Sequence, residues 1–288
     1  MPRLFERVTI AGVGLIGGSL ALAARRAGLI GHVTGLGRGA ANLRTAQQRG
    51  IIDRYTHDPL DAVRGADLLL LAVPVRSIAA VVQACAPALQ AGAVISDVGS
   101  VKASVIREVE AVLPAGVSFV GAHPIAGTEE SGAAAARADL FQGSRCIITP
   151  GPRSDAAAIV KLRALWEGVG MRVSELDAAR HDEILAWVSH LPHALAFSAV
   201  NALLDVDGAA AEFAGPSWGD LTRVAASSVE LWRDIFVANA EQLDAALSRF
   251  VGVLEELRVA IGRRDEALLR TLLERAYTAR RQWTAAQK

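Results

Sequence analysis

The chain is 288 residues long, which exceeds the usual size of one domain and predicts two domains. It carries 30 basic and 30 acidic residues, so its formal net charge is zero and no overall field favours nucleic acid or an anionic membrane. The composition therefore argues against proteins that bind polyanions through bulk charge, and we expect no nucleic-acid or membrane partner.

The cysteines and the first residues indicate the cell compartment. Cys85 and Cys146 lie in apolar surroundings without metal-ligand spacing, so we interpret both as buried thiols in a reducing compartment. The sequence Met-Pro-Arg-Leu-Phe-Glu-Arg leads directly into an apolar run and lacks the layout of a cleaved signal peptide. We expect a cytoplasmic protein, and the end of the sequence at Lys288 predicts no appended regulatory domain.

Short apolar runs alternate with helix-like stretches in the first half of the sequence, which is typical of a parallel sheet wrapped by helices. The alternation ends near Leu176, and helical periodicity follows from Asp177 onward. We predict an α/β domain over residues 1–176 and an all-α domain over residues 177–288. The predicted strands are residues 8–11, 32–36, 67–73, 93–96, 118–122, 146–149 and 172–176, and the predicted helices of the first domain are 15–27, 40–49, 78–89 and 156–169.

Residues 184–204 contain no Lys, Arg, Asp or Glu, and their length approaches that of a membrane span. The segment also holds two histidines and other polar groups, which are costly in lipid. We therefore predict a buried helix of an oligomeric protein. Residues 229–259 form a long amphipathic stretch, and the helices together carry more apolar surface than one small domain buries. A homodimer through the C-terminal domain is the expected assembly.

A glycine-rich turn follows the first predicted strand and opens the first predicted helix, as the dinucleotide-binding fingerprint requires. Gly12 permits the tight turn, Gly14 lets the backbone approach a pyrophosphate, and Gly17 lets the helix lie close to the sheet. The pyrophosphate would lie on amide groups at the positive end of the helix dipole. The first domain is therefore predicted to be of Rossmann type, with cofactor contacts at Gly12, Gly14, Leu15, Ile16, Gly17, Val73 and Pro74.

The end of the second strand bears on the choice of dinucleotide. NAD sites usually place an acid there for the ribose 2′-hydroxyl, whereas here Leu36 is followed by Gly37-Arg38-Gly39. Arg38 can pair with a 2′-phosphate and stack on adenine. The sequence favours NADP over NAD, with an Arg38 that is only a surface residue as the alternative.

Polar clusters follow two later strands, at residues 96–102 and 121–132. Ligands of doubly wound sheets lie beyond the carboxyl ends of the strands, so we expect Ser100 to lie near His123. The Ser100 hydroxyl could then bond one ring nitrogen and fix the tautomer, which leaves the other nitrogen to accept a proton. The alternative is a His123 that only caps its strand.

Six segments carry a family resemblance. Taken together and in order, they resemble the prephenate/arogenate (cyclohexadienyl) dehydrogenase family of tyrosine biosynthesis. The segments are Gly-Val-Gly-Leu-Ile-Gly-Gly-Ser at 12–19, Asp-Val-Gly-Ser-Val-Lys at 97–102, Gly-Ala-His-Pro-Ile-Ala-Gly-Thr-Glu at 121–129, Ser-His-Leu-Pro-His at 189–193, Asp-Leu-Thr-Arg at 220–223 and Leu-Trp-Arg-Asp-Ile at 231–235. They span nearly the whole chain.

The resemblance implies oxidative decarboxylation of prephenate, arogenate or both, to 4-hydroxyphenylpyruvate or tyrosine, with hydride transfer to NAD(P). It implies that His123 assists removal of the proton from the ring hydroxyl, help that is typically worth ~10²–10⁴ in rate. Ser100 is implied to orient His123 near the nicotinamide and the substrate. The helical domain is implied to bind substrate and to form the dimer.

Further substrate contacts are implied by the same resemblance. Arg223 is the candidate for a substrate carboxylate, because a planar guanidinium can bind a carboxylate through two parallel hydrogen bonds. Glu129 and Asp220 resemble the family's active-site carboxylates and are expected to pair with Arg223 and to gate access. Thr128, beside Glu129, is assigned to the same substrate site.

His190 and His193 are three residues apart on an apolar helix and face nearly the same way. Without the resemblance they could be a metal pair or two core histidines, but no Cys or third His lies at ligand spacing, so no metal is expected. The resemblance makes His193 a substrate-binding residue and His190 its neighbour. Pro192 is expected to kink the helix.

Two alternatives stay open. Another hydroxyacid dehydrogenase, of the β-hydroxyacid type, would use a lysine on a helix of the second domain, yet the only lysine after Lys161 is Lys288. A catalytically silent NAD(P)-binding redox sensor would keep the fold without the reactive groups, which this sequence retains. The sequence leaves open the preference between prephenate and arogenate, feedback by tyrosine and the role of Lys102, and it assigns no role to His32, His57 and His181.

Overall fold

The structure is a computed structural model that describes residues 3–128 and 130–286. The chain forms two compact units, residues 1–240 and 241–288. These units differ from the two predicted domains, because helical residues after Asp177 pack on the α/β part. Trp232 and Ile235, for example, belong to the same core cluster as Leu71. The domain boundary near Leu176 stays a prediction.

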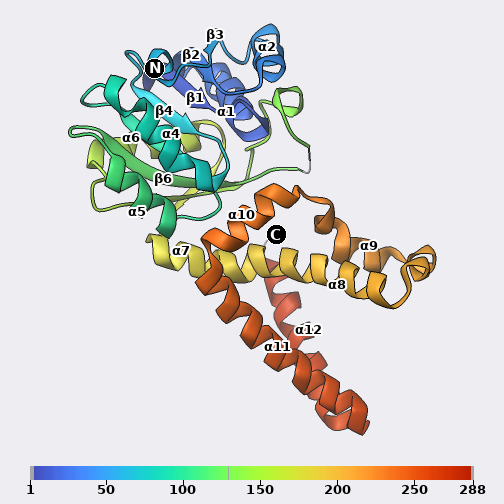
Figure 1. Cartoon of the computed structure of the whole chain (residues 1–288). Helices are drawn as coiled ribbons and strands as arrows, with labels where there is room; N and C mark the ends of the chain where they lie inside the picture. The colour runs from blue at the N-terminus through green and yellow to red at the C-terminus, as the bar shows by residue number, and fades with distance from the viewer. Residues whose placement is uncertain (1–2, 129, 287–288) are drawn as a thin grey trace. The chain divides into compact units, whose positions relative to one another are not determined.

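The first unit is built on one eight-stranded sheet with the order β3-β2-β1-β4-β5-β6-β7-β8 (Figure 1). Every neighbouring pair is parallel except β6 and β7. The order of the first six strands is that of doubly wound dinucleotide-binding sheets, so the predicted fold class is confirmed. The strands are β1 (Phe5–Ala11), β2 (Ile30–Leu36), β3 (Arg54–Thr56), β4 (Leu68–Leu71), β5 (Val94–Asp97), β6 (Ser118–Ile125), β7 (Arg145–Pro150) and β8 (Arg172–Glu175).

Helices cover both faces of this sheet (Figure 1). Residues of α1, α2 and α6 form one apolar core with one face, and residues of α4, α5 and α10 form a second core with the other. All four residues of β4 are buried, as expected for a central strand with both faces covered. The helices of this part are α1 (Leu15–Arg26), α2 (Ala40–Gln48), α3 (Pro59–Ala62), α4 (Ile78–Cys85), α5 (Ala103–Val112) and α6 (Ala156–Gly168).

The structure adds β3, α3 and α5 to the predicted elements, and it extends β6 to Ile125. His123 therefore lies within a strand and not after one. The pairing of β6 with β5 ends at Ser96 and Val120, and beyond that point β6 pairs only with β7. His123 is thus beyond the last β5 partner, where ligands of such sheets bind.

The helical part of the first unit begins with α7 (Ala178–Leu185), a π-helical turn η4 (Ala186–His190) and α8 (Leu191–Asp207). Pro192 lies in the first turn of α8. The π-helical turn η4 before it accommodates the missing N–H of the proline, whereas the sequence predicted a kink in the helix. After α8 come the 3₁₀ segment η5 (Gly208–Phe213), α9 (Pro216–Thr222), the 3₁₀ turn η6 (Arg223–Ala226) and α10 (Val229–Ala238).

One helical run, Ala178–Phe213, is long and apolar enough to cross a membrane by length and composition alone. Only 6% of its most apolar window is buried within the chain. The prediction of a buried helix concerned an oligomeric protein, so it stays a prediction for this single chain. Within the chain, α8 contacts α9 and η6.

The second compact unit consists of the long helices α11 (Ala240–Arg263) and α12 (Glu266–Ala286). The predicted stretch 229–259 is divided between α10 and α11, with Asn239 between the two helices. Between α11 and α12 the chain turns at Arg264, with φ of 54°, and the Asp265 side chain accepts from the N–H of Leu268 at 3.0 Å. Large apolar side chains of both helices are exposed, among them Val251, Leu254, Ile261, Leu273, Tyr277 and Trp283.

Candidate active site

The glycine turn between β1 and α1 leaves room for a phosphate group. Gly12 has φ of 87°, and a Cβ atom there would lie 2.2 Å from the carbonyl oxygen of Ala72. Among the described atoms, none lies within 4 Å of a Cβ built at Gly14. The N-terminus of α1 receives no side-chain cap from Gly14, so its first amide groups are available to a ligand. This geometry fits a dinucleotide pyrophosphate.

The other candidate cofactor residues surround this turn. Leu15 and Ile16 direct their side chains to the core, so they can contact a dinucleotide only through their backbone. Val73 and Pro74 follow β4, the strand next to β1. Arg38 follows β2 and is exposed, in the position where the ribose of a bound dinucleotide would lie.

His123, His181 and Asp182 form a buried hydrogen-bonded series. The Nδ1 atom of His123 lies 2.9 Å from Nε2 of His181, and Nδ1 of His181 lies 2.7 Å from Oδ1 of Asp182. A carboxylate only accepts hydrogen bonds, so His181 Nδ1 donates to Asp182 and its Nε2 accepts from Nδ1 of His123. The series therefore leaves Nε2 of His123 unprotonated and able to accept a proton.

Asp182 is also held by the backbone. Its two carboxylate oxygens accept from the N–H groups of Lys102 and Ala103, each at 2.8 Å, at the start of α5. The carboxylate thus compensates unpaired amides of the helix N-terminus while it orients His181. The His181 side chain and the start of α5 are fixed to each other through this one residue.

The environment of His123 keeps the ring neutral. Burial lowers the pKa of His123 well below 6.5, and nearby His181, Lys102 and His190 lower it further because a second positive charge is unfavourable there. Burial also lowers the pKa of His181, although the hydrogen bond to Asp182 opposes this effect. A neutral imidazole with a free Nε2 is the protonation state that a general base requires.

Lys102 and Asp97 position the backbone that carries His123. Both side chains are fully buried and form an ion pair. Asp97 Oδ1 accepts from the N–H of Ala122 at 3.2 Å, and Lys102 Nζ donates to the carbonyl oxygen of Ala122 at 3.0 Å. The backbone pairing of β5 with β6 ends at Val120, and beyond that point these two side chains are the hydrogen-bond partners of the β6 backbone on this side. The role of Lys102, which the sequence left open, is to hold this strand.

Ser100 differs from its expected role. It is half-buried in the turn between β5 and α5, and the described residues include no hydrogen bond between its hydroxyl and His123. Its backbone lies close to His190 and raises the pKa of that ring slightly against the effect of burial. His181, to which the sequence assigned no role, holds Nδ1 of His123. The adjacent pair His181-Asp182 in α7 is the sequence signal that could have indicated this role of His181.

His193 and Trp232 form a stacked pair at the wide turn. The ring centroids are 3.4 Å apart with an interplanar angle of 21°, and Nδ1 of His193 donates to the carbonyl oxygen of Ser189 at 2.9 Å. The His193 ring is therefore fixed, with Nε2 free as an acceptor. Burial lowers the pKa of His193, and the positive charge of Arg223 lowers it further.

His190 is fully buried beside this pair. Its Nδ1 accepts from the Asn239 amide at 3.1 Å, so Nε2 carries the proton, and Nε2 has no partner among the described residues. Burial lowers the pKa of His190 to about 4. The ring is a neutral donor next to the turn that carries Ser100.

The structure shows no hydrogen bond or ion pair that joins the remaining substrate candidates of the described residues, which are Arg223, Asp220 and Thr128, to one another. Arg223 begins η6 and Asp220 lies in α9, and these two described residues form no ion pair, so the expected pairing is absent. Thr128 is exposed in the loop after β6, and its hydroxyl accepts from the N–H of Glu130 at 3.3 Å. Glu129 lies outside the described residues.

The glycine turn after β1 fits a dinucleotide, and a neutral buried histidine lies in β6, three strands away in the sheet. Together these features define an NAD(P)-dependent dehydrogenase. Residues 20–175 match the model of the prephenate dehydrogenase nucleotide-binding domain, and residues 177–275 match that of the prephenate dehydrogenase dimerization domain. The chain therefore belongs to the prephenate dehydrogenase family, and the resemblance carried by the six segments is confirmed.

Individual relatives agree with this assignment. The chain is 38% identical to a cyclohexadienyl dehydrogenase of Zymomonas mobilis over 266 residues, which cover 91% of this chain and 90% of that protein. A prephenate dehydrogenase of Aquifex aeolicus, solved with hydroxyphenyl propionate and NAD+, superimposes with a TM-score of 0.90 at 33% identity, covering 96% of this chain and 98% of the other. An arogenate dehydrogenase of Synechocystis gives a TM-score of 0.82 at 27% identity, with 96% and 99% covered.

Proposed function

We propose that this enzyme oxidatively decarboxylates prephenate, arogenate or both, with NAD(P) as the hydride acceptor and 4-hydroxyphenylpyruvate or tyrosine as the product. The observation that carries the proposal is the neutral, buried His123, whose Nε2 is left free by the series through His181 to Asp182. The substrates named for the similar proteins are cyclohexadienyl acids whose ring hydroxyl needs such a base.

The proposed step assigns the proton to this chain. Nε2 of His123 accepts the proton of the ring hydroxyl as hydride leaves the ring carbon that bears this hydroxyl. Carbon dioxide then leaves, the ring becomes aromatic, and His123 returns the proton to the oxygen to give the phenol. The positive charge that develops on His123 is stabilised through His181 by the Asp182 carboxylate, which is held by two backbone amides. Bound NAD(P), held by the glycine turn, supplies the acceptor for the hydride. Ser100, between the ends of β5 and α5, is assigned to the nicotinamide side of the substrate.

The substrate carboxylates require a local cation because the chain has no net charge. The positive charge of Arg223 lowers the pKa of His193, so Arg223 is the cation of this region and His193 is neutral. We assign a substrate carboxylate to Arg223 and a further polar contact to Nε2 of His193, whose ring is fixed on Trp232. His190, Thr128, Glu129 and Asp220 are assigned to the surrounding wall of the same site.

Arg38 supports NADP as the preferred cofactor. The residue is exposed beyond β2, and no acid follows that strand within Gly37-Arg38-Gly39 to repel a 2′-phosphate. The similar Aquifex aeolicus enzyme was solved with NAD+, so both cofactors belong in the test.

The exposed apolar surface of the helical part supports a homodimer. Only 6% of the most apolar window in the helical run Ala178–Phe213 is buried in one chain, and the matching family model describes a dimerization domain. A second copy of the chain is the occupant we propose for this surface, in a cytoplasmic enzyme without a nucleic-acid or membrane partner. Light scattering of the purified protein should give twice the chain mass, and a monomer at micromolar concentration would contradict the dimer.

One assay tests the function. The rate of reduced-cofactor formation is measured with prephenate and with arogenate, each with NAD and with NADP. Turnover with either acid supports the proposal and gives the substrate and cofactor preference. A folded protein that binds dinucleotide but turns over neither acid would overturn it and favour the redox-sensor alternative.

A further inference from the structure

The segment after β6 returns to the dinucleotide-binding half of the sheet. We call it the return segment; it comprises residues 126–137, all described except Glu129, and contains the 3₁₀ turn η3 (Ala133–Ala135). Turn η3 contacts α1, which begins at the glycine turn, and α2. The return segment therefore connects the strand that carries His123 to the part of the chain that fits a dinucleotide.

Asn42 of α2 joins the glycine turn to the return segment. Its Nδ2 donates to the carbonyl oxygen of Val13 at 2.7 Å, and its Oδ1 accepts from the N–H of Ala133 at 2.7 Å. A carbonyl oxygen only accepts and an N–H only donates, so these two partners fix the orientation of the Asn42 amide. One side chain thus holds backbone groups of both segments.

The peptide between Val13 and Gly14 is fixed on both of its sides. Its carbonyl oxygen is held by Asn42, and its N–H donates to the carbonyl oxygen of Gly12 at 3.0 Å. The carbonyl oxygen of Gly14 accepts from the N–H of Gly18 at 2.9 Å, in the first turn of α1. Asn42 is therefore part of the framework that shapes the turn on which a pyrophosphate would lie.

The return segment also rests on α1 and α2 through other contacts. The Ser19 hydroxyl of α1 accepts from the N–H of Arg137 at 2.9 Å. The guanidinium of Arg49, which follows α2, donates to three carbonyl oxygens of the segment, those of Ala133, Ala134 and Ala136. These contacts hold the segment in place, but among the described residues only Asn42 bonds both to it and to the glycine turn.

We propose that Asn42 is a positioning residue that couples the dinucleotide site to the return segment, so that a bound dinucleotide stabilises the segment and strengthens substrate binding. The second part rests on the proposed function, because Thr128 and Glu129 of this segment are assigned to the substrate site. The first part, the link between the glycine turn and the segment, needs no substrate.

The physical reason is a shared support. A dinucleotide that holds the backbone at Val13 also holds the Asn42 amide, so the N–H of Ala133 bonds to a partner that is already fixed. A group that docks on a rigid partner loses less conformational entropy than one that must order the partner as well. Coupling of this kind is reciprocal, so an occupied substrate site should also tighten dinucleotide binding.

Hydrogen exchange of the full chain tests the first part, with and without a saturating concentration of NAD+ or NADP+, whichever binds more tightly. In the original chain the dinucleotide should slow exchange of the Ala133 and Arg137 amides by about fivefold or more. Asn42→Ala should lose this effect at its own saturating concentration. Asn42→Asp is nearly isosteric, and it keeps an acceptor for Ala133 but has no donor for Val13, so it should lose the effect too.

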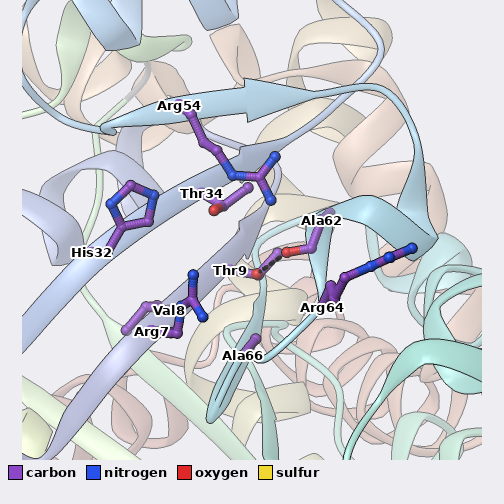
Figure 2. A pocket seen from close by; sticks show the side chains of 9 residues that line it. All are labelled: Arg7, Val8, Thr9, His32, Thr34, Arg54, Ala62, Arg64 and Ala66. Atoms are coloured by element: carbon purple, nitrogen blue, oxygen red, sulfur yellow. Dashed lines mark hydrogen bonds between the residues drawn. The ribbon is translucent and has the colours of Figure 1, made fainter.

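The second part is tested by the dinucleotide Kd, measured with and without saturating product, 4-hydroxyphenylpyruvate or tyrosine. The product should lower this Kd by about fivefold or more in the original chain and hardly at all in the two Asn42 variants. Arg64→Gln is the control. Figure 2 shows Arg64 beside a small cavity lined by residues of β1, β2 and β3, away from the glycine turn, and its loss should leave both measurements unchanged.

Equal protection of the return segment in the original chain and in both Asn42 variants, or no protection in any of them, would overturn the coupling. A product effect on the Kd that persists in both variants would overturn it as well. Failure of the proposed function gives a different pattern. Neither prephenate nor arogenate would then be turned over and neither product would change the Kd, while the protection by dinucleotide would still depend on Asn42.

Discussion

His123 and His181 are in direct hydrogen-bond contact, Nδ1 to Nε2 at 2.9 Å, although they are 58 residues apart in the sequence. The contact joins the strand that carries the proposed base to the helical part that carries the proposed substrate groups. It also sets the tautomer of His123, because His181 is itself oriented by Asp182.

Replacing His123 with Asn should abolish most of the activity. The variant keeps a polar side chain of similar size but has no group that accepts a proton near pH 7, so we expect kcat to fall by ~10²–10⁴. Dinucleotide affinity, measured by fluorescence titration, should not change because the glycine turn is untouched. Turnover within a few fold of the original would remove His123 from the mechanism.

Replacing His181 with Asn should lower kcat less, by about 10- to 100-fold, because His123 remains but loses the partner that sets its tautomer. The limb of the pH profile that reports protonation of His123 should shift, whereas the substrate KM should stay close to its original value. A variant with reduced stability and an unchanged pH profile would show that His181 has only a structural role. His57→Asn, which changes an exposed histidine, is the control.

Arg223→Gln should raise the substrate KM by about 10- to 100-fold, the loss expected for a hydrogen-bonded charge pair with a carboxylate. The cofactor KM and the thermal midpoint should change little because the side chain is exposed. Arg180→Gln is the matched control, since Arg180 is exposed on α7 and pairs only with Glu183. An equal effect in both variants would mean that Arg223 contributes general charge and not a specific contact.

Acid should destabilise the fold through its buried histidines. His190 has its pKa lowered to about 4 in the folded chain, against 6.5 ordinarily, so between these values only the unfolded chain binds the proton. The stability from this group is complete above pH 6.5 and is lost as the pH falls to about 4, in total about 3 kcal/mol. His123 and His181 act in the same direction.

Urea unfolding at several pH values measures this loss. His190→Gln should be less stable than the original chain at neutral pH, because it disturbs the contact with Asn239, but its stability should depend less on pH. If the variant and the original chain lose stability with the same slope below pH 6.5, His190 does not titrate on unfolding as we expect.

Lys102→Met should cost about 3–5 kcal/mol of unfolding free energy, since it leaves the Asp97 carboxylate buried without its partner. The double variant Asp97→Asn/Lys102→Met removes both charges and should recover part of the loss. Urea midpoints of the two single variants, Lys102→Met and Asp97→Asn, and of the double variant provide the measurement. If the double variant loses as much unfolding free energy as the two single variants lose together, the Asp97 and Lys102 side chains act independently.

The sequence by itself determined the features that depend on local pattern. The alternation of apolar runs and helical stretches predicted the sheet and most of its elements, because burial on a strand or a helix face imposes a short period on the residues. The turn at Gly12 to Gly17 predicted the cofactor site, because all the residues that form this turn are adjacent in the sequence. His123 and Arg223 were found through segments that, taken in order, resemble the prephenate/arogenate dehydrogenase family.

The tertiary structure alone decided which distant groups meet. Ser100 was expected to orient His123 because the two residues follow neighbouring predicted strands. The partner is instead His181, which α7 brings to the ring through its contacts with β7 and α5. Asp182 caps α5 from 80 residues away. Such contacts depend on how strands pair and helices cross, which no short stretch of sequence specifies.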